Sequence, residues 1–173
     1  MHRSRPEPRL IPRRAALTLL CGGALAPLSG CAGGGVSQPF EYTLLDGSRH
    51  RDAALRGKVV LVNFWATTCA VCVREMPQLS ATHLKYRTRG FETLAVALRQ
   101  DAPARVAHFA QSRALPFGVV IDNTGSVERA FGGVNVTPTS LLIDKRGAIV
   151  KRFAGALDVV SLHARVEALL AQA

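Results

Sequence analysis

The chain has 173 residues, 48% of them hydrophobic, and carries 22 Lys and Arg against 12 Asp and Glu, a formal charge of +10. This length and apolar content suit one domain with a buried core and exclude a disordered chain. Four cysteines are too few for a scaffold held together by disulfides. The charge alone would suggest a nucleic-acid or membrane-surface partner, so its place in the chain has to be considered first.

The first thirty residues have the pattern of an export signal. Residues 1–14 contain five arginines and one glutamate, and an apolar run follows over residues 15–28. That run is shorter than the ~18 residues of a membrane-spanning helix and suits a secretory signal peptide. It ends in Leu28-Ser29-Gly30-Cys31, which resembles the bacterial lipobox and implies cleavage before Cys31 and lipidation of that cysteine. The alternatives are an ordinary signal with an incidental cysteine, and twin-arginine export through Arg13-Arg14.

Removal of residues 1–30 changes the charge of the chain. Residues 31–173 keep 17 basic and 11 acidic residues, a charge of +6, scattered as single residues and short pairs such as Lys145-Arg146. No basic stripe alternates with aromatic residues, so we expect no nucleic-acid partner. Residues 31–39, rich in glycine, are expected to be a flexible tether to the membrane, and residues 40–173 one folded domain.

The rest of the chain alternates strand and helix patterns. Two short segments, 40–45 and 49–54, flank the turn Asp46-Gly47-Ser48 and predict an N-terminal hairpin. Apolar runs and helical spacing then predict, in chain order, a strand at 58–66, a helix from 69 to about 87, a strand at 91–98, a helix at 103–112, a strand at 117–121 and a short helix at 127–131. A second hairpin is predicted over 139–144 and 148–153, followed by a helix with Asp158 as its N-cap. This order predicts an α/β domain with a mixed sheet.

The chemistry is expected at Cys69-Ala70-Val71-Cys72, where the first buried strand gives way to a helix. Two intervening residues at a helix start let the sulfurs meet, and the helix N-terminus favours the thiolate of Cys69. Cys69 should therefore attack a substrate disulfide, and Cys72 should resolve the mixed disulfide. The other interpretations are half of a zinc site and a structural disulfide. The remaining cysteines belong to the signal region, and the histidines after residue 30 lack ligand spacing.

Two motifs resemble a known family. Residues 59–77, VVLVNFWATTCAVCVREMP, are similar to the active-site segment of the TlpA/ResA-like group of thioredoxin-fold proteins, and residues 133–144, GVNVTPTSLLID, to the cis-proline strand of that group. The likeness spans about residues 40–171. It implies a thioredoxin-like fold, with a mixed central sheet flanked by helices and a central insertion at 102–131.

The same resemblance implies a function. Members of the group are membrane-tethered, extracytoplasmic thiol-disulfide oxidoreductases, often reductants in cytochrome c maturation or copper-site assembly. Their partners are protein thiols and disulfides, together with an upstream membrane electron donor or acceptor. No cofactor and no resident metal are implied.

Several residues match the family motifs. Cys69 and Cys72 match the redox pair, Pro138 the proline held cis beside it, and Thr137 the residue whose backbone pairs with an extended substrate. Glu75 matches a glutamate close to the cysteines, where a carboxylate could accept the proton of the resolving cysteine or raise its pKa. The alternative for this residue is a solvated helix carboxylate.

The rim of the site departs from the family pattern. Thr68 and Val71 stand where the family usually has tryptophan and proline. We expect Thr68 to give a smaller, more polar substrate rim beside Trp65, which is either a substrate contact or a packing residue. Because no histidine lies between the cysteines and Glu75 disfavours negative charge, we expect a moderately reducing protein. Residues 99–101, Arg-Gln-Asp, follow a strand end on the same side and are candidates for shaping the rim.

Two other classes of function remain open. A pair of soft thiolates suits Cu(I), so the protein could bind or deliver copper, although no third ligand is evident beside the pair. A redox-silent binding module on the same fold is the other possibility, and the presence of both cysteines argues against it.

Overall fold

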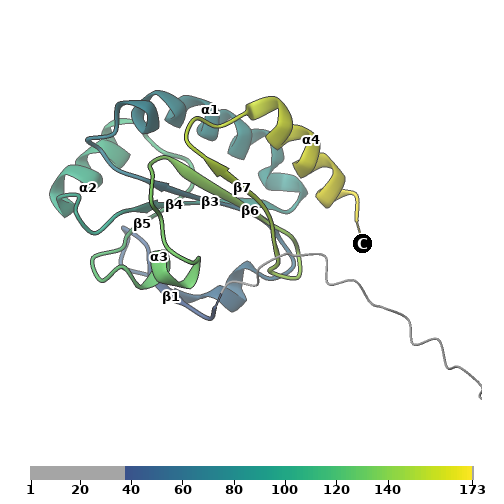
Figure 1. Ribbon diagram of the computed structural model, residues 1–173, viewed down its shortest axis with the longest axis horizontal. Coiled ribbons are helices and arrows are strands. Elements are labelled where there is room, and N and C mark those ends of the chain that lie inside the picture. Colours follow the sequence, from purple (N-terminus) through teal and green to yellow (C-terminus); the bar gives the residue numbers. More distant parts are fainter. Residues whose placement is uncertain (1–37, 173) are drawn as a thin grey trace, which may run out of the picture. The chain divides into compact units, whose positions relative to one another are not determined.

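The computed structural model describes residues 38–172 and shows a layered α/β domain (Figure 1). The predicted signal peptide, the lipidation site at Cys31 and most of the predicted tether lie outside these residues. Five strands form the central sheet in the order β5-β4-β3-β6-β7, with β3, β4 and β5 parallel and β6 and β7 antiparallel to their neighbours. The strands are β3 (Val59–Trp65), β4 (Phe91–Ala97), β5 (Gly118–Ile121), β6 (Thr139–Ile143) and β7 (Ile149–Ala154).

Helices cover both faces of the sheet. Three of them, α1 (Ala70–Tyr86), α2 (Pro103–Ser112) and α4 (Val159–Leu170), lie on one face (Figure 1). The other face carries α3 (Ser126–Ala130) and the hairpin of β1 (Glu41–Thr43) and β2 (Arg49–Arg51), which continues into a 3₁₀ turn at Asp52–Leu55. A second 3₁₀ turn, Arg87–Arg89, follows α1. This arrangement confirms the predicted mixed sheet flanked by helices and the N-terminal hairpin. Within residues 38–172, no helix combines the length and apolar character needed to cross a membrane.

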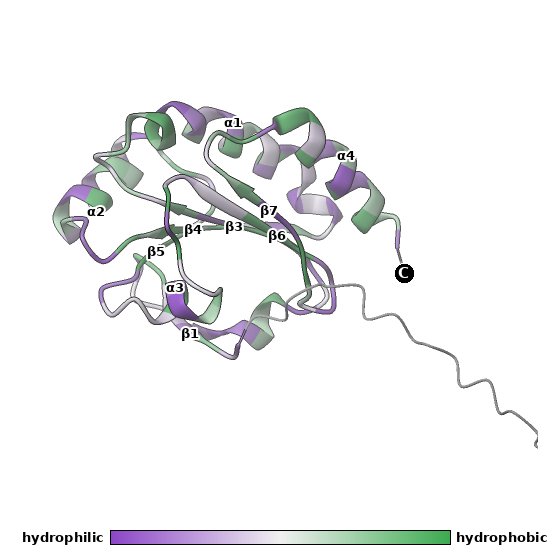
Figure 2. Ribbon diagram, viewed as in Figure 1, coloured by the Kyte–Doolittle hydropathy of each residue, from purple (hydrophilic) through white to green (hydrophobic). Residues whose placement is uncertain are grey.

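The sheet lies between two apolar layers. Strand β3 is buried along its whole length, and alternate residues face opposite sides. Leu61 and Trp65 join α1, α2 and α4 in one core cluster, whereas Val62 and Phe64 join the hairpin and α3 in the other. Figure 2 shows hydrophobic stretches along the central strands and helices in which hydrophobic and hydrophilic residues alternate. A continuous apolar sequence is what a strand covered on both faces requires.

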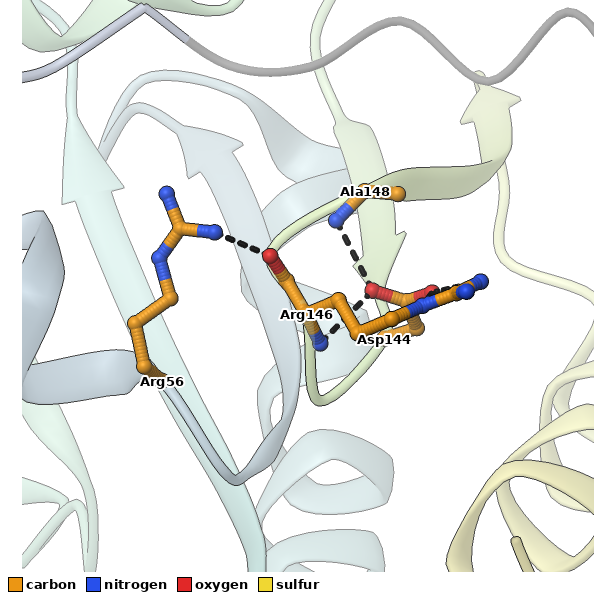
Figure 3. Close-up of polar contacts among 4 residues, drawn as sticks. All are labelled: Arg56, Asp144, Arg146 and Ala148. Carbon is orange, nitrogen blue, oxygen red and sulfur yellow. Dashed lines mark hydrogen bonds and ion pairs between the residues drawn. The ribbon is translucent and has the colours of Figure 1, made fainter.

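The β6–β7 turn is fixed by polar contacts at the end of the sheet away from Trp65 (Figure 3). The carboxylate of Asp144 accepts hydrogen bonds from the backbone N–H groups of Arg146 and Ala148, at 2.9 and 2.8 Å, and the Arg56 side chain donates to the Arg146 carbonyl. Burial by itself would raise the pKa of Asp144, but these hydrogen bonds and the Arg146 side chain outweigh it and hold the pKa below its usual value. The turn thus anchors the hairpin whose opposite end carries Pro138.

Candidate active site

The site lies at the edge of the sheet where β3 and β4 end and β6 begins. The register pairs Trp65 with Ala97 and Phe64 with Thr139, so the segments that follow β3 and β4 meet the segment that precedes β6. Cys69 and Cys72 lie in the first of these segments. The fold therefore brings the predicted cysteine motif and Pro138 to one edge, although Cys72 and Pro138 are 66 positions apart in the sequence.

Cys69 and Cys72 form a disulfide, with their Cα atoms 5.2 Å apart. Cys69 is the N-cap of α1, and its sulfur accepts a hydrogen bond from the Cys72 backbone N–H at 3.2 Å. Cys69 is partly exposed, whereas Cys72 is only 1% exposed and belongs to the core cluster beneath α1. The two sulfurs are thus unequal: one is open to a partner at a helix N-terminus, where a thiolate is favoured, and the other is shielded.

Glu75 is buried one helical turn beyond Cys72, with 7% of its surface exposed. One carboxylate oxygen, Oε1, accepts a hydrogen bond from the Leu157 backbone N–H at 2.7 Å, and the buried Oε2 has no hydrogen-bond partner within residues 38–172. Burial raises the pKa of the Glu75 carboxyl, against smaller opposing effects of the Leu157 hydrogen bond and of the charge of Arg74. The structure therefore makes Glu75 an internal carboxylate rather than a solvated one.

Asp101 is a site residue whose role the sequence did not reveal. It follows β4, is 5% exposed, and both of its carboxylate oxygens accept hydrogen bonds from Thr67, one from the backbone N–H and one, at 2.7 Å, from the hydroxyl. The Cys69 N–H in turn bonds to the Ala66 carbonyl at 3.1 Å. Asp101 thus holds in place the turn that presents Cys69. Asp101 and Thr67 are 34 positions apart in the sequence, which hides this contact from any local pattern, and only the position of Asp101 after a strand pointed to the rim.

The Thr137–Pro138 peptide bond is cis. The Pro138 carbonyl accepts a hydrogen bond from the Gly155 N–H at 2.8 Å, which ties it to the loop between β7 and α4. Within the described part of the chain, the backbone of Thr137 makes no hydrogen bond. Its N–H and C=O groups are therefore free to pair with another extended segment.

Trp65 and Thr68 lie at different depths. Thr68 is exposed in the turn before Cys69. Trp65 is completely buried and packs on Phe109 of α2, with ring centroids 5.2 Å apart. This burial puts the indole beneath the site and out of reach of a docked chain, so of the two roles considered for Trp65 the structure favours packing.

This arrangement can perform one kind of chemistry directly. It has an accessible sulfur at a helix N-terminus, a shielded second sulfur in disulfide contact with it, and an unpaired backbone segment beside the pair. No group of three or more His, Cys, Asp and Glu side chains that could hold a metal ion occurs among residues 38–172. Fold and site together define a thioredoxin-like thiol-disulfide oxidoreductase.

Comparison with known proteins gives the family. Residues 34–169 match the Redoxin family, to which this chain belongs. The chain is 35% identical over 136 residues to the thiol-disulfide oxidoreductase ResA of Geobacillus thermodenitrificans, covering 79% of this chain and 77% of that protein. It is 32% identical over 171 residues to ResA of Geobacillus kaustophilus, covering 94% and 97%. The resemblance to the ResA-like group and the assignment as a thiol-disulfide oxidoreductase are thereby confirmed.

Solved structures share the fold. A protein described as a thioredoxin from Neisseria meningitidis is 37% identical, with a TM-score of 0.72 over 77% of this chain and 88% of its own. A thiol:disulfide interchange protein of the thioredoxin family from Chlorobium tepidum is 26% identical, with a TM-score of 0.72 over 80% of this chain and 98% of its own. These matches confirm the thioredoxin-like fold.

Proposed function

We propose that the protein is an extracytoplasmic, membrane-anchored reductant of protein disulfides. Residues 1–30 would direct export, Cys31 would carry the lipid, and residues 31–39 would tether the domain, as the sequence pattern suggests. An upstream membrane electron donor would supply the electrons, and the substrates would belong to cytochrome c maturation or copper-site assembly. The observation that carries the proposal is the Cys69–Cys72 pair, with one accessible and one shielded sulfur at a helix N-terminus.

The proposed reaction moves two electrons to the substrate. The Cys69 thiolate attacks one sulfur of the substrate disulfide, so that a mixed disulfide forms and one substrate thiolate leaves. The Cys72 thiolate then attacks the Cys69 sulfur and releases the second substrate thiolate, which leaves the protein oxidised and the substrate reduced. The donor returns two electrons and two protons to the Cys69–Cys72 disulfide.

Other residues support these two steps in the proposal. Glu75 Oε2, which has no hydrogen-bond partner among the described residues, accepts the proton of the buried Cys72 thiol. The unpaired backbone of Thr137, beside the cis Pro138, binds the substrate segment as an added strand. Thr68 forms the exposed rim of the site, and Trp65 forms its floor.

The test is trapping of the mixed disulfide. The Cys72→Ser variant should accumulate a covalent complex with a disulfide substrate, because its second step is missing, whereas Cys69→Ser should form none. A redox titration of the unmodified protein against glutathione should show a reversible two-electron transition at a potential well below the ~−120 mV of DsbA. Absence of that transition, together with tight Cu(I) retention by the two thiolates, would support the copper-binding alternative instead.

A further inference from the structure

Three exposed arginines lie on segments at the edge of the sheet where the disulfide lies. Arg74 lies in the second turn of α1, two residues after Cys72, Arg99 lies in the loop that follows β4, and Arg105 lies in the first turn of α2. All three are exposed, and none forms an ion pair within residues 38–172.

These arginines are tied to the site by the chain around them. The α2 helix begins two residues after Asp101, whose carboxylate holds Thr67 of the cysteine loop. Arg99 comes from the same loop, and its Cδ atom lies close to Gly125 at the start of α3, which extends the positive surface toward the end of β5. The N-termini of α1 and α2 open at this edge and add their positive ends to it.

The carboxylates of this edge do not balance that charge at the surface. Glu75, Asp101 and Asp122 are buried, with 7%, 5% and 3% of their surfaces exposed. Each accepts a hydrogen bond from a backbone N–H of a neighbouring segment. Asp158 is exposed at the start of α4, where its carboxylate caps the helix by accepting from the Ser161 N–H. Glu128 of α3 is half-buried, and its Oε2 lies near Gly125 beside Arg99, but the Nη1 of Arg129 lies nearer to the same glycine. Positive side chains therefore outnumber exposed carboxylates at this edge among the described residues.

We infer that the protein partners of this enzyme present their reactive cysteine pair within an acidic segment, which docks on Arg74, Arg99 and Arg105. The inference rests on the proposed exchange with protein disulfides and names the chemistry of the partner. Opposite charges on two surfaces raise the association rate by about 10- to 1,000-fold at low ionic strength, and the effect falls steeply as salt is added. At physiological ionic strength the screening length is about 8 Å, so only charges close to the partner's cysteine pair contribute.

The test uses three synthetic peptides, each with one intramolecular disulfide flanked by three Glu, three Gln or three Lys residues on each side. Residues 32–173 are used in reduced form, because they contain both core clusters and lack the arginines of residues 1–14. We expect second-order rate constants about tenfold higher for the Glu peptide than for the Lys peptide at 20 mM salt, with the ratio close to one at 500 mM. The Arg74→Gln/Arg99→Gln/Arg105→Gln variant should lose most of the ratio.

The ratio of the rate constants for the Glu and Lys peptides separates the effect of docking from the reactivity of the sulfurs. Any effect of Arg74 on the sulfurs changes the rates of all three peptides together and cancels in the ratio. The matched control Arg87→Gln/Arg113→Gln/Arg165→Gln removes the same charge from exposed arginines that follow the last residues of α1 and α2 or lie within α4, and it should keep the preference.

Three results overturn the inference. Equal rates for the three peptides contradict acidic docking while leaving disulfide exchange intact. An equal loss of preference in both triple variants means that only net charge matters. If the first triple variant instead loses affinity for phosphatidylglycerol vesicles while its peptide preference is unchanged, the arginines face the membrane. Failure of all three peptides to react contradicts the proposed function itself.

Discussion

The carboxylate of Asp101 acts on the nucleophile through a single threonine. Its two oxygens accept hydrogen bonds from the backbone N–H and the hydroxyl of Thr67, and it forms no ion pair within residues 38–172. The carboxylate is therefore a positioning group for the turn before Cys69 and also a buried negative charge near the site. These two effects can be separated, because one depends on hydrogen bonds and the other on charge.

Replacing Asp101 by Asn should lower both stability and the pKa of Cys69. The amide oxygen can still accept from the Thr67 N–H and the amide N–H can donate to the hydroxyl, but two charge-assisted hydrogen bonds become neutral ones, at a cost of about 1 kcal/mol in the free energy of unfolding. Removal of the negative charge favours the thiolate, so the alkylation rate of reduced protein should reach half its maximum at lower pH. Thr67→Val, which removes only the hydroxyl, should lower stability without moving that pH profile. An unchanged pH dependence of alkylation in Asp101→Asn would show that the carboxylate only positions the turn before Cys69.

Glu75 makes stability depend on pH in a direction that can be stated. Its pKa is raised in the folded protein, chiefly by burial, so the folded state binds a proton more tightly than the unfolded state. The contribution of this bound proton to stability is complete below the pKa of Glu75 in the unfolded state and is lost as pH rises through the pKa of Glu75 in the folded state. At neutral pH, ionisation of Glu75 therefore lowers the stability of the fold, because the buried carboxylate has one oxygen without a hydrogen-bond partner within residues 38–172.

The Glu75→Gln variant should be more stable than the parent protein at pH 7–8. The amide oxygen still accepts from the Leu157 N–H, and no charge is buried, so we expect a gain on the order of 1 kcal/mol in urea unfolding. The gain should shrink as pH is lowered toward 4, because the parent carboxyl becomes protonated. The same variant should release product from mixed disulfides more slowly if Glu75 accepts the Cys72 proton. A stability difference that does not vary with pH would contradict the assignment.

At the scale of elements, α1 and α4 begin at residues whose side chains cap the helix, Cys69 and Asp158. Asp158, predicted as an N-cap, accepts from the Ser161 N–H at 3.0 Å and starts α4, whose Leu162 and Val166 enter the core. Asp158→Ala should lower the free energy of unfolding by about 1 kcal/mol, measured by urea denaturation. Ser161→Ala keeps the donor N–H and should change it by less than about 0.5 kcal/mol. Equal losses in both variants would mean that the cap contributes nothing.

Most helices and strands could be predicted from the sequence, because the periodicity of apolar residues and the positions of turn residues are local properties. Helix α2 was predicted at its observed bounds, and β3, β4 and α1 within one residue at each end. The second half of the N-terminal hairpin is shorter than predicted, because residues 52–55 turn into a 3₁₀ helix after three strand residues. Pro77 lies inside α1, which runs as one helix from Ala70 to Tyr86.

Contacts between distant residues were beyond local pattern. The Glu75–Leu157 bond joins residues 82 apart, and its depth depends on how α4 and the preceding loop pack on α1. Equally, family resemblance and not spacing indicated the cis bond at Pro138, because X–Pro bonds in folded proteins are cis only about 5–6% of the time. The cysteine motif itself was predictable, since its spacing and its place after a buried strand are both local.

At the scale of the whole molecule, the redox state is linked to folding. Within residues 38–172, Cys69 and Cys72 are the only cysteines, and Cys72 is part of the core cluster shared by α1, α2 and α4. A thermodynamic cycle links two quantities. If the disulfide is harder to reduce in the folded protein than in an unstructured chain, the oxidised protein is more stable against unfolding than the reduced protein by the same free energy. In DsbA, a strong oxidant, it is the reduced form that is stabilised.

The oxidised form of this protein should therefore unfold at the higher temperature. Glu75 and Asp101 are buried carboxylates beside the pair, and both disfavour a thiolate in the reduced state, whereas the α1 N-terminus favours it. Since every 30 mV corresponds to about 1.4 kcal/mol, a potential some 30–60 mV below that of an unstructured dithiol makes the oxidised form more stable by about 1.4–2.8 kcal/mol. Calorimetry of both forms, with Cys69→Ser/Cys72→Ser as the reference without a disulfide, measures this difference. A reduced form more stable than the oxidised one would make the protein an oxidant and reverse the proposed direction of electron flow.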